Sequence, residues 1–242
     1  MPYETRYGTF IARSRLTASK ARALYAAGLR VVLLQVDWQR SKLGQRSIEQ
    51  LREEQRVAGA AGLEVWWWAW VTPTLRPEAG RRPSGANALG RRLDELVAAL
   101  GSPAGFVADA EVGGRWTRAR LGELPLVAAA ARNAGMPIVG LTSHGMLSRE
   151  WGVGAWDVGL PQFYGGDAID VDFSRRCLAT WDDARTIWIC LGCADAASTP
   201  EQMRGDLRTI EELGVEPRPG VAWWTARQLR HDNGRLAAAV PR

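Results

Sequence analysis

The chain has 242 residues and a mass of 26.5 kDa, with 46% hydrophobic residues, 24% charged residues and a net charge of +5. This composition is that of an ordinary globular protein and excludes disordered, collagen-like and disulfide-stapled chains. Apolar runs fall well short of the ~20 residues of a membrane-spanning helix, and basic residues do not alternate with aromatic ones as in nucleic-acid sites, so we expect neither a membrane span nor a nucleic-acid partner.

The first residues, MPYETRYGTF, carry neither the basic segment nor the apolar segment of a secretory signal. We therefore expect no signal peptide and a protein that is cytoplasmic when made. All basic residues except Lys20 and Lys42 are arginine. That bias is explained by a GC-rich genome or, alternatively, by a surface for an anionic partner such as a cell-wall polymer.

A recurring pattern of helix, glycine and strand organises the chain. Segments with a helical sequence pattern end at Gly28, Gly62, Gly101 and Gly135, and a β-rich run follows each within a few residues. A looser copy of this pattern follows Gly214. Glycine just beyond a helix adopts the left-handed conformation that satisfies the last carbonyl groups. Each of these junctions, which we call glycine seams, therefore predicts the end of a helix and the start of a strand.

The segments between the seams have the helical period. Two sets of apolar residues are each spaced to line one face of a helix: Leu89, Leu93, Leu96, Val97 and Leu100, and then Met203, Leu207, Ile210 and Leu213. Thr199 to Gln202 supplies a cap, a proline at the first helical position and a capping-box glutamine.

About eight strands alternate with these helices, and several are almost wholly apolar, as in a parallel sheet covered on both faces. We expect them near Gly8–Ala12, Val31–Asp37, Glu64–Val71, Phe106–Glu111, Ile138–Ser143, Val158–Tyr164, Ile187–Leu191 and Val221–Trp224. Eight strand-helix units in one domain, residues 1–242, predict an α/β fold, a (β/α)8 TIM barrel. The alternative, an open doubly wound sheet, would show a glycine-rich loop after the first strand, where this chain reads RSRLTASK.

The cysteines predict no metal site. Cys190 and Cys193 form a C-x-x-C pair, but the only other cysteine is Cys177, so a four-ligand zinc site lacks its second pair. The pair lies in TIWICLGC, a strand-like run rather than the helix start of redox proteins. Buried thiols in a reducing compartment explain this pattern better than redox chemistry.

The fourth expected strand ends in Asp109-Ala110-Glu111, at the end of a barrel strand where active sites lie. Alternation along a strand points Asp109 and Glu111 the same way. If they face inward, the close like charges keep one carboxyl protonated beside an ionised partner, as glycoside hydrolysis requires. We take Glu111 as the acid and Asp109 as its assistant. A metal site, or pairing with Arg115 or Arg118, is the alternative.

Tryptophans and polar residues at other strand ends supply a candidate lining. The chain has 12 tryptophans, whose faces stack on sugar rings, although some must serve as core filler. A Ser-His-acid triad lacks support because there is no G-x-S-x-G motif. The expected substrate contacts are Asp37, Trp38, Trp68, Trp70, His144, Gln162, Tyr164, Trp223 and Trp224.

The segments GFVADAE, MPIVGLTSHG, WDVGLPQFYGG and VAWWTARQL resemble TIM-barrel glycoside hydrolase-like domains of phages and prophages, distantly similar to family 18 chitinases and family 25 lysozymes. The resemblance implies that Glu111 is the acid, that Asp109 and Tyr164 hold a substrate N-acetyl group, and that Trp223 or Trp224 forms the floor. The chain departs from the chitinase motif at Val107 and Ala104, where aspartates are expected, and Gly165 follows the tyrosine.

These observations favour a glycosidase that acts on an N-acetylated cell-wall glycan such as peptidoglycan, without a cofactor. The resemblance also implies an endolysin-like or tail-associated protein, released by lysis or carried in a virion-like particle with phage partner proteins. The first alternative is a catalytically silent glycan-binding or structural barrel. The second is a metal-dependent barrel enzyme that uses Asp37, Asp109, Glu111 and His144 as ligands.

Overall fold

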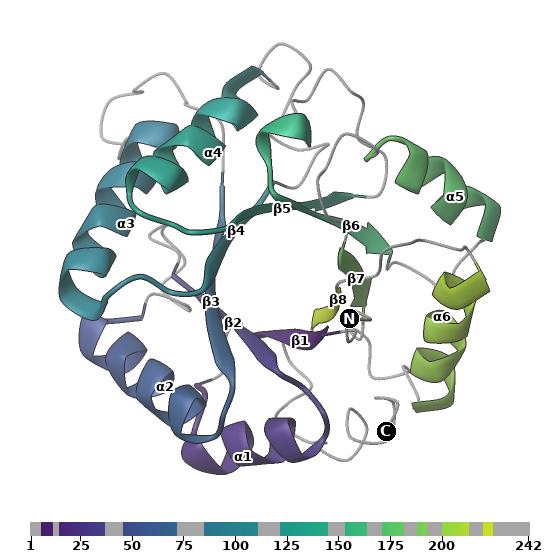
Figure 1. Ribbon diagram of the computed structural model, residues 1–242, viewed down its shortest axis with the longest axis horizontal. Helices are drawn as coiled ribbons and strands as arrows, with labels where there is room; N and C mark the ends of the chain where they lie inside the picture. Colours follow the sequence, from purple (N-terminus) through teal and green to yellow (C-terminus); the bar gives the residue numbers. More distant parts are fainter. Residues whose placement is uncertain are drawn as a thin grey trace, which may run out of the picture.

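A computed structural model shows eight parallel strands in the closed order β1 to β8 (Figure 1). It describes residues 6–11, 15–36, 46–71, 85–110, 122–144, 153–163, 171–181, 188–192, 200–212 and 220–224. Each strand pairs with the next along the chain, and β1 also pairs with β8. The strands are β1 (Arg6–Ile11), β2 (Val31–Gln35), β3 (Glu64–Trp70), β4 (Gly105–Asp109), β5 (Val139–His144), β6 (Val158–Phe163), β7 (Trp188–Gly192) and β8 (Gly220–Trp224).

Helices surround the ring of strands (Figure 1). They are α1 (Ala18–Ala26), α2 (Ile48–Ala60), α3 (Ala86–Leu100), α4 (Leu124–Asn133), α5 (Val171–Ala179) and α6 (Pro200–Glu212). Between β5 and β6 the described residues hold only a three-residue 3-10 helix, η3 (Val153–Ala155), and the chain after β8 lies outside the description. The structure thus shows a parallel-stranded α/β barrel architecture, while the full eightfold strand-and-helix repeat stays a prediction.

The glycine seams end helices as predicted. Gly28, Gly62, Gly101 and Gly135 have φ angles of 94°, 81°, 77° and 83°, in the left-handed region that glycine adopts without strain. Pro200 is the first residue of α6, as its sequence position predicted, whereas Thr199 and Gly214 lie outside the described residues. None of the helices described here is long and apolar enough to span a membrane.

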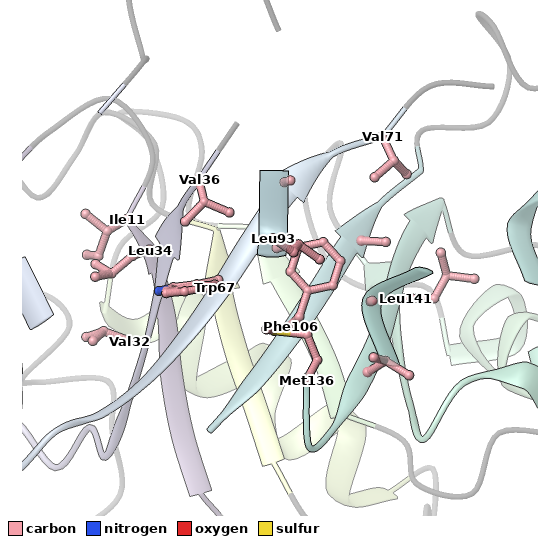
Figure 2. Close-up of a cluster of buried hydrophobic side chains, with 14 of the residues drawn as sticks. Ile11, Val32, Leu34, Val36, Trp67, Val71, Leu93, Phe106, Met136 and Leu141 are labelled. Carbon is pink, nitrogen blue, oxygen red and sulfur yellow. The ribbon is translucent and has the colours of Figure 1, made fainter. Parts of the chain in front are cut away.

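Alternation along the strands divides the buried residues into two clusters. The outer core lies between the strands and the helices (Figure 2) and includes Ile11, Val32, Leu34, Val36, Trp67, Leu93, Phe106 and Leu141. The inner core fills the barrel and consists of Phe10, Val31, Leu33, Trp66, Trp68, Val107, Val158 and Leu160. Because residues two apart share a face, this division identifies which strand-end residues continue the inner side of the barrel.

The strand ends differ slightly from the sequence prediction. β2 ends at Gln35, not Asp37, and β4 ends at Asp109, not Glu111. Pairing extends just past both ends, since the backbone N–H of Val36 donates to Trp68 and that of Ala110 donates to Thr142. Asp37 and Glu111 lie outside the described residues.

Candidate active site at the carboxyl ends of the strands

Asp109 lies on the inner face of the barrel at the end of β4. It is two residues beyond Val107 of the inner core and is only 2% exposed. Its strand register places it opposite Trp70 of β3 on one side and Thr142 of β5 on the other. The condition that the sequence left open, an inward-facing Asp109, is therefore met.

A hydrogen-bond chain connects Asp109 to the two following strands. Gln162 Nε2, on β6, donates to Asp109 Oδ1 at 3.3 Å and to Thr142 Oγ1 at 3.2 Å. Thr142 Oγ1 donates in turn to the carbonyl oxygen of Leu160 at 2.8 Å. All three polar side chains are buried. Sequence reasoning included Gln162 but missed Thr142, although its place near the end of an apolar strand was a usable signal.

The predicted tryptophans of β3 have different environments. Trp68 is 2% exposed and packs edge-on against Phe10, with ring centroids 5.7 Å apart and planes at 78°. Trp70, next to Asp109 in register, is 46% exposed. Its ring is therefore the one that a ligand can cover without first displacing core packing.

Most other predicted site residues cannot be placed as side chains. Asp37, Trp38, Glu111 and Tyr164 lie outside the described residues. Strand register places three further residues: His144 pairs with Gln162, Trp223 with Thr9, and Trp224 with Phe10. Their roles, and that of Glu111 above all, stay predictions.

Gln35, which sequence reasoning missed, also belongs to this end of the barrel. It closes β2 and follows Val31 and Leu33 on the inner face. Its Oε1 is buried and has no hydrogen-bond partner among the described residues. No sequence signal distinguished it, because a single glutamine at a strand end is common.

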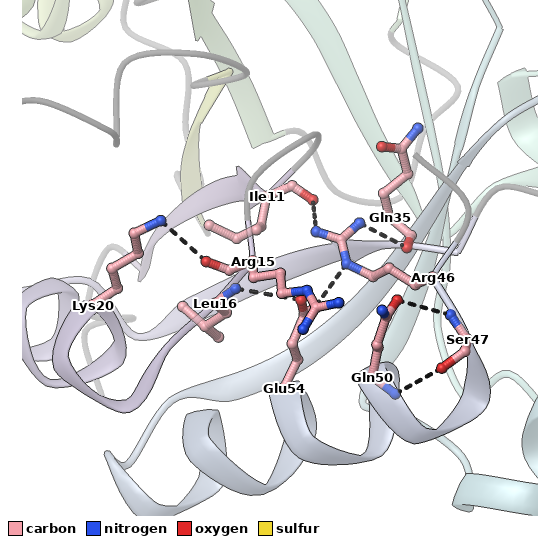
Figure 3. Close-up of polar contacts among 9 residues, drawn as sticks. All are labelled: Ile11, Arg15, Leu16, Lys20, Gln35, Arg46, Ser47, Gln50 and Glu54. Carbon is pink, nitrogen blue, oxygen red and sulfur yellow. Dashed lines mark hydrogen bonds and ion pairs between the residues drawn. The ribbon is translucent and has the colours of Figure 1, made fainter. Parts of the chain in front are cut away.

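A buried ion pair fixes the ends of β1 and β2 (Figure 3). Arg46 Nε lies 2.7 Å from Glu54 Oε2, and the guanidinium also donates to the carbonyl oxygens of Gln35 at 3.1 Å and Ile11 at 3.3 Å. The other oxygen of Glu54 accepts from the backbone N–H of Leu16 at 3.4 Å. One side-chain pair thus connects α2 to the last residues of two strands and to the segment that leads into α1.

Burial governs the electrostatics of this pair. Desolvation lowers the pKa of Arg46 and raises the pKa of Glu54, and the attraction between the two charges opposes both shifts. Both charges lose their hydration in the fold, and their mutual attraction offsets part of that cost. We interpret the pair as a device that positions strand ends rather than as a source of stability.

The described residues contain no group of three or more His, Cys, Asp or Glu side chains placed to hold a metal ion. Of the four ligands of the metal hypothesis, only the Asp109 side chain is described. Cys177 is a buried free thiol whose pKa is raised by burial, as expected for a structural cysteine. The side chains of the C-x-x-C pair lie outside the description.

Comparison with known proteins places the fold. The sequence matches no protein-family model and no curated protein, but the structure matches a GH113 β-1,4-mannanase with a TM-score of 0.67 and 12% identity, over 97% of this chain and 93% of the other. The chain therefore shares a barrel fold with that mannanase. The ICChI chitinase from Ipomoea carnea matches at a TM-score of 0.59 and 12% identity, over 97% of this chain and 100% of the other.

A third match, the xylanase and α-amylase inhibitor protein XAIP-II from Scadoxus multiflorus, has a TM-score of 0.64 and 10% identity and covers 98% of both chains. At 10 to 12% identity these likenesses concern the fold alone. Function has to be argued from the site.

Proposed function

We propose that this protein is a glycoside hydrolase that acts on an N-acetylated cell-wall glycan, peptidoglycan or chitin-like, within a single-domain (β/α)8 barrel of residues 1–242. The observation that carries the proposal is the buried Asp109 on the inner face at the carboxyl end of β4, bonded to Gln162 of β6. Barrel enzymes hold their catalytic groups at this end of the strands. The glycosidase-like fold supports the same reading.

In the proposed mechanism Glu111 is the general acid and Asp109 assists it. Glu111 protonates the glycosidic oxygen as the bond to the anomeric carbon breaks. Asp109, held by Gln162, orients the substrate N-acetyl group so that its oxygen attacks the anomeric carbon. A water molecule then opens the resulting ring, and Glu111 takes back a proton. This substrate-assisted route needs no second enzymic nucleophile and no cofactor.

The remaining predicted contacts complete the glycan site. Trp70 offers an exposed ring for a neighbouring sugar, and Gln162 contributes from the opposite side of Asp109. We assign further contacts to Asp37, Trp38, His144, Tyr164, Trp223 and Trp224, whereas Trp68 is 2% exposed and packs in the inner core. The resemblance in the sequence extends the proposal to an endolysin-like or tail-associated protein of a phage-like particle.

A catalytically silent glycan-binding or structural barrel is the second candidate. Two observations favour it: Val107 and Ala104 stand where the motif has aspartates, and one of the matched barrels is an inhibitor protein of xylanase and α-amylase. Such a barrel would bind the glycan and release no product.

Release of reducing ends from purified peptidoglycan and from chitin oligomers tests the proposal. We expect the wild type to release them and Glu111→Gln to abolish release, because the amide cannot donate the required proton. Glu95→Gln, on the exposed face of α3, is the matched control and should retain full activity. Binding to the polymer without release, by the wild type, would overturn the enzymic proposal in favour of the silent barrel.

A further inference from the structure

The direction of every proton in the Gln162 network follows from the donors and acceptors present. Thr142 has one hydroxyl proton and donates it to the carbonyl oxygen of Leu160, so its Oγ1 faces Gln162 as an acceptor. The group that Gln162 points toward Thr142 and Asp109 must therefore be its NH2 and not its oxygen. The donors and acceptors around the amide therefore determine which of its two terminal atoms is the nitrogen.

Gln162 consequently has one unused group. Both of its Nε2 protons are committed, one to Asp109 and one to Thr142. Its Oε1 is buried, has no hydrogen-bond partner in the described part of the chain, and belongs to a residue only 3% exposed. A buried carbonyl oxygen without a partner is costly, so a bound group that donates a hydrogen bond would be strongly favoured there.

Gln35 presents a second oxygen of this kind from another strand. It stands at the end of β2 on the inner face, and its Oε1 is also buried without a partner among the described residues. Figure 3 shows its side chain extending away from Arg46, whose guanidinium holds the Gln35 carbonyl oxygen. The ion pair with Glu54 thereby fixes the backbone that carries this amide.

We propose that this end of the barrel selects its ligand by the hydrogen-bond donors that the ligand carries. Gln162 Oε1 and Gln35 Oε1 each accept a hydrogen bond from a hydroxyl or amide N–H of a bound sugar beside Asp109. The inference rests on the proposed function in taking the ligand to be a carbohydrate. Because Asp109 and both amide oxygens are acceptors, a carboxylate on that sugar would meet no donor among them and would repel Asp109. The sugar at this position is therefore an uncharged one, so an alternating cell-wall glycan binds through its carboxylate-free residue.

A cycle between protein variants and ligand variants tests this inference. Methyl chitobiosides that each lack one hydroxyl or the amide N–H are titrated calorimetrically into Glu111→Gln, which prevents turnover, and into the same protein with Gln162→Met or Gln35→Met. A ligand that lacks the donor bound by Gln162 should bind Glu111→Gln about tenfold more weakly than the complete ligand, which corresponds to one neutral hydrogen bond. In the protein that also carries Gln162→Met, the two ligands should bind equally well. Gln35→Met should abolish the effect of a different donor.

Gln55→Met is the matched control, because the Oε1 of Gln55 is also buried without a partner among the residues that the structure describes, but Gln55 lies on α2. It should leave every ligand difference unchanged. Equal losses for all ligands in every variant would overturn the inference, and so would tighter binding of a chitobioside analogue with a carboxylate on the sugar. If Gln162→Met does not fold, the Gln35→Met cycle decides alone.

The outcomes separate this inference from the proposed function. In one outcome, the effect of removing a ligand donor depends on Gln162 or Gln35 while the wild type releases no reducing ends. That outcome would support the inference about donors and contradict the proposed hydrolase function. Release of reducing ends by the wild type, with ligand effects that do not depend on Gln162 or Gln35, would support the hydrolase function and overturn the inference about donors. Failure of Glu111→Gln to bind any chitobioside would overturn donor reading, while the release assay on peptidoglycan would still decide the proposed function.

Discussion

Arg46 Nε and Glu54 Oε2 lie 2.7 Å apart, with side chains only 7% and 3% exposed. The guanidinium also binds the carbonyl oxygens that end β1 and begin the exit from β2. Burying such a pair costs free energy because both charges lose their hydration. Breaking the pair costs more, because a single substitution leaves one buried charge unpaired. This asymmetry leads to the first two predictions.

Replacing one partner should cost more stability than replacing both. Glu54→Leu leaves the Arg46 charge buried without its carboxylate and should lower the free energy of unfolding by about 3–5 kcal/mol. Arg46→Met combined with Glu54→Leu removes both charges and should cost less than Glu54→Leu alone. Urea unfolding of the two single variants and the double variant measures this, and additive losses would contradict the prediction.

The pair should also give stability a distinctive pH dependence. Burial raises the pKa of Glu54 above its ordinary value of 4.5, so the folded chain holds this proton more tightly than the unfolded chain does. Its contribution to stability is fully present below pH 4.5 and is lost as the pH rises through the folded pKa. The unfolding free energy of the wild type minus that of Glu54→Gln should therefore fall as the pH rises above 4.5. A difference that grows with pH would contradict the direction of the shift.

Gly105 is required by the packing of Trp66. A Cβ added at Gly105 would lie 2.7 Å from Trp66 Cδ2, in an indole ring that is itself buried in the barrel. Gly105→Ala should therefore cost about 1–3 kcal/mol of unfolding free energy through overpacking. Gly59→Ala, in the last turn of α2 with no atom within 4 Å of the new Cβ, should stabilise by about 0.5–1 kcal/mol. Thermal or urea unfolding compares them, and equal effects would refute the packing explanation.

Trp70 should contribute to glycan affinity but not to folding. Its ring is 46% exposed beside Asp109, and covering about 60 Å² more of it with a sugar face is worth roughly 1.5 kcal/mol. Trp70→Ala should thus bind chitin oligomers about tenfold more weakly, with nearly unchanged unfolding free energy. Leu126→Ala, at an exposed apolar residue on α4, is the control for general surface effects. Unchanged affinity of Trp70→Ala in titration calorimetry would remove Trp70 from the site.

The order of the helices and strands could be predicted from the amino-acid sequence alone. A glycine at Gly28 or Gly62 ends a helix because the left-handed conformation is a property of that residue alone. That Asp109 and Val107 share a strand face is equally local, whereas the tertiary structure showed that this face is the inner one. Patterns with a period of two or of 3.6 residues need no knowledge of the rest of the chain.

The contacts between residues of different strands depend on the folded chain and could not be predicted from local patterns. The fold brings Gln162 to both Asp109 and Thr142, and it brings Arg46 to Glu54 and to two strand ends, although these segments lie far apart in sequence. It also separated Trp68, enclosed in the barrel, from Trp70, which is half exposed two residues later on the same face. The physical reason is that burial and hydrogen-bond partners depend on what the other strands bring to a position, and no local period contains that information.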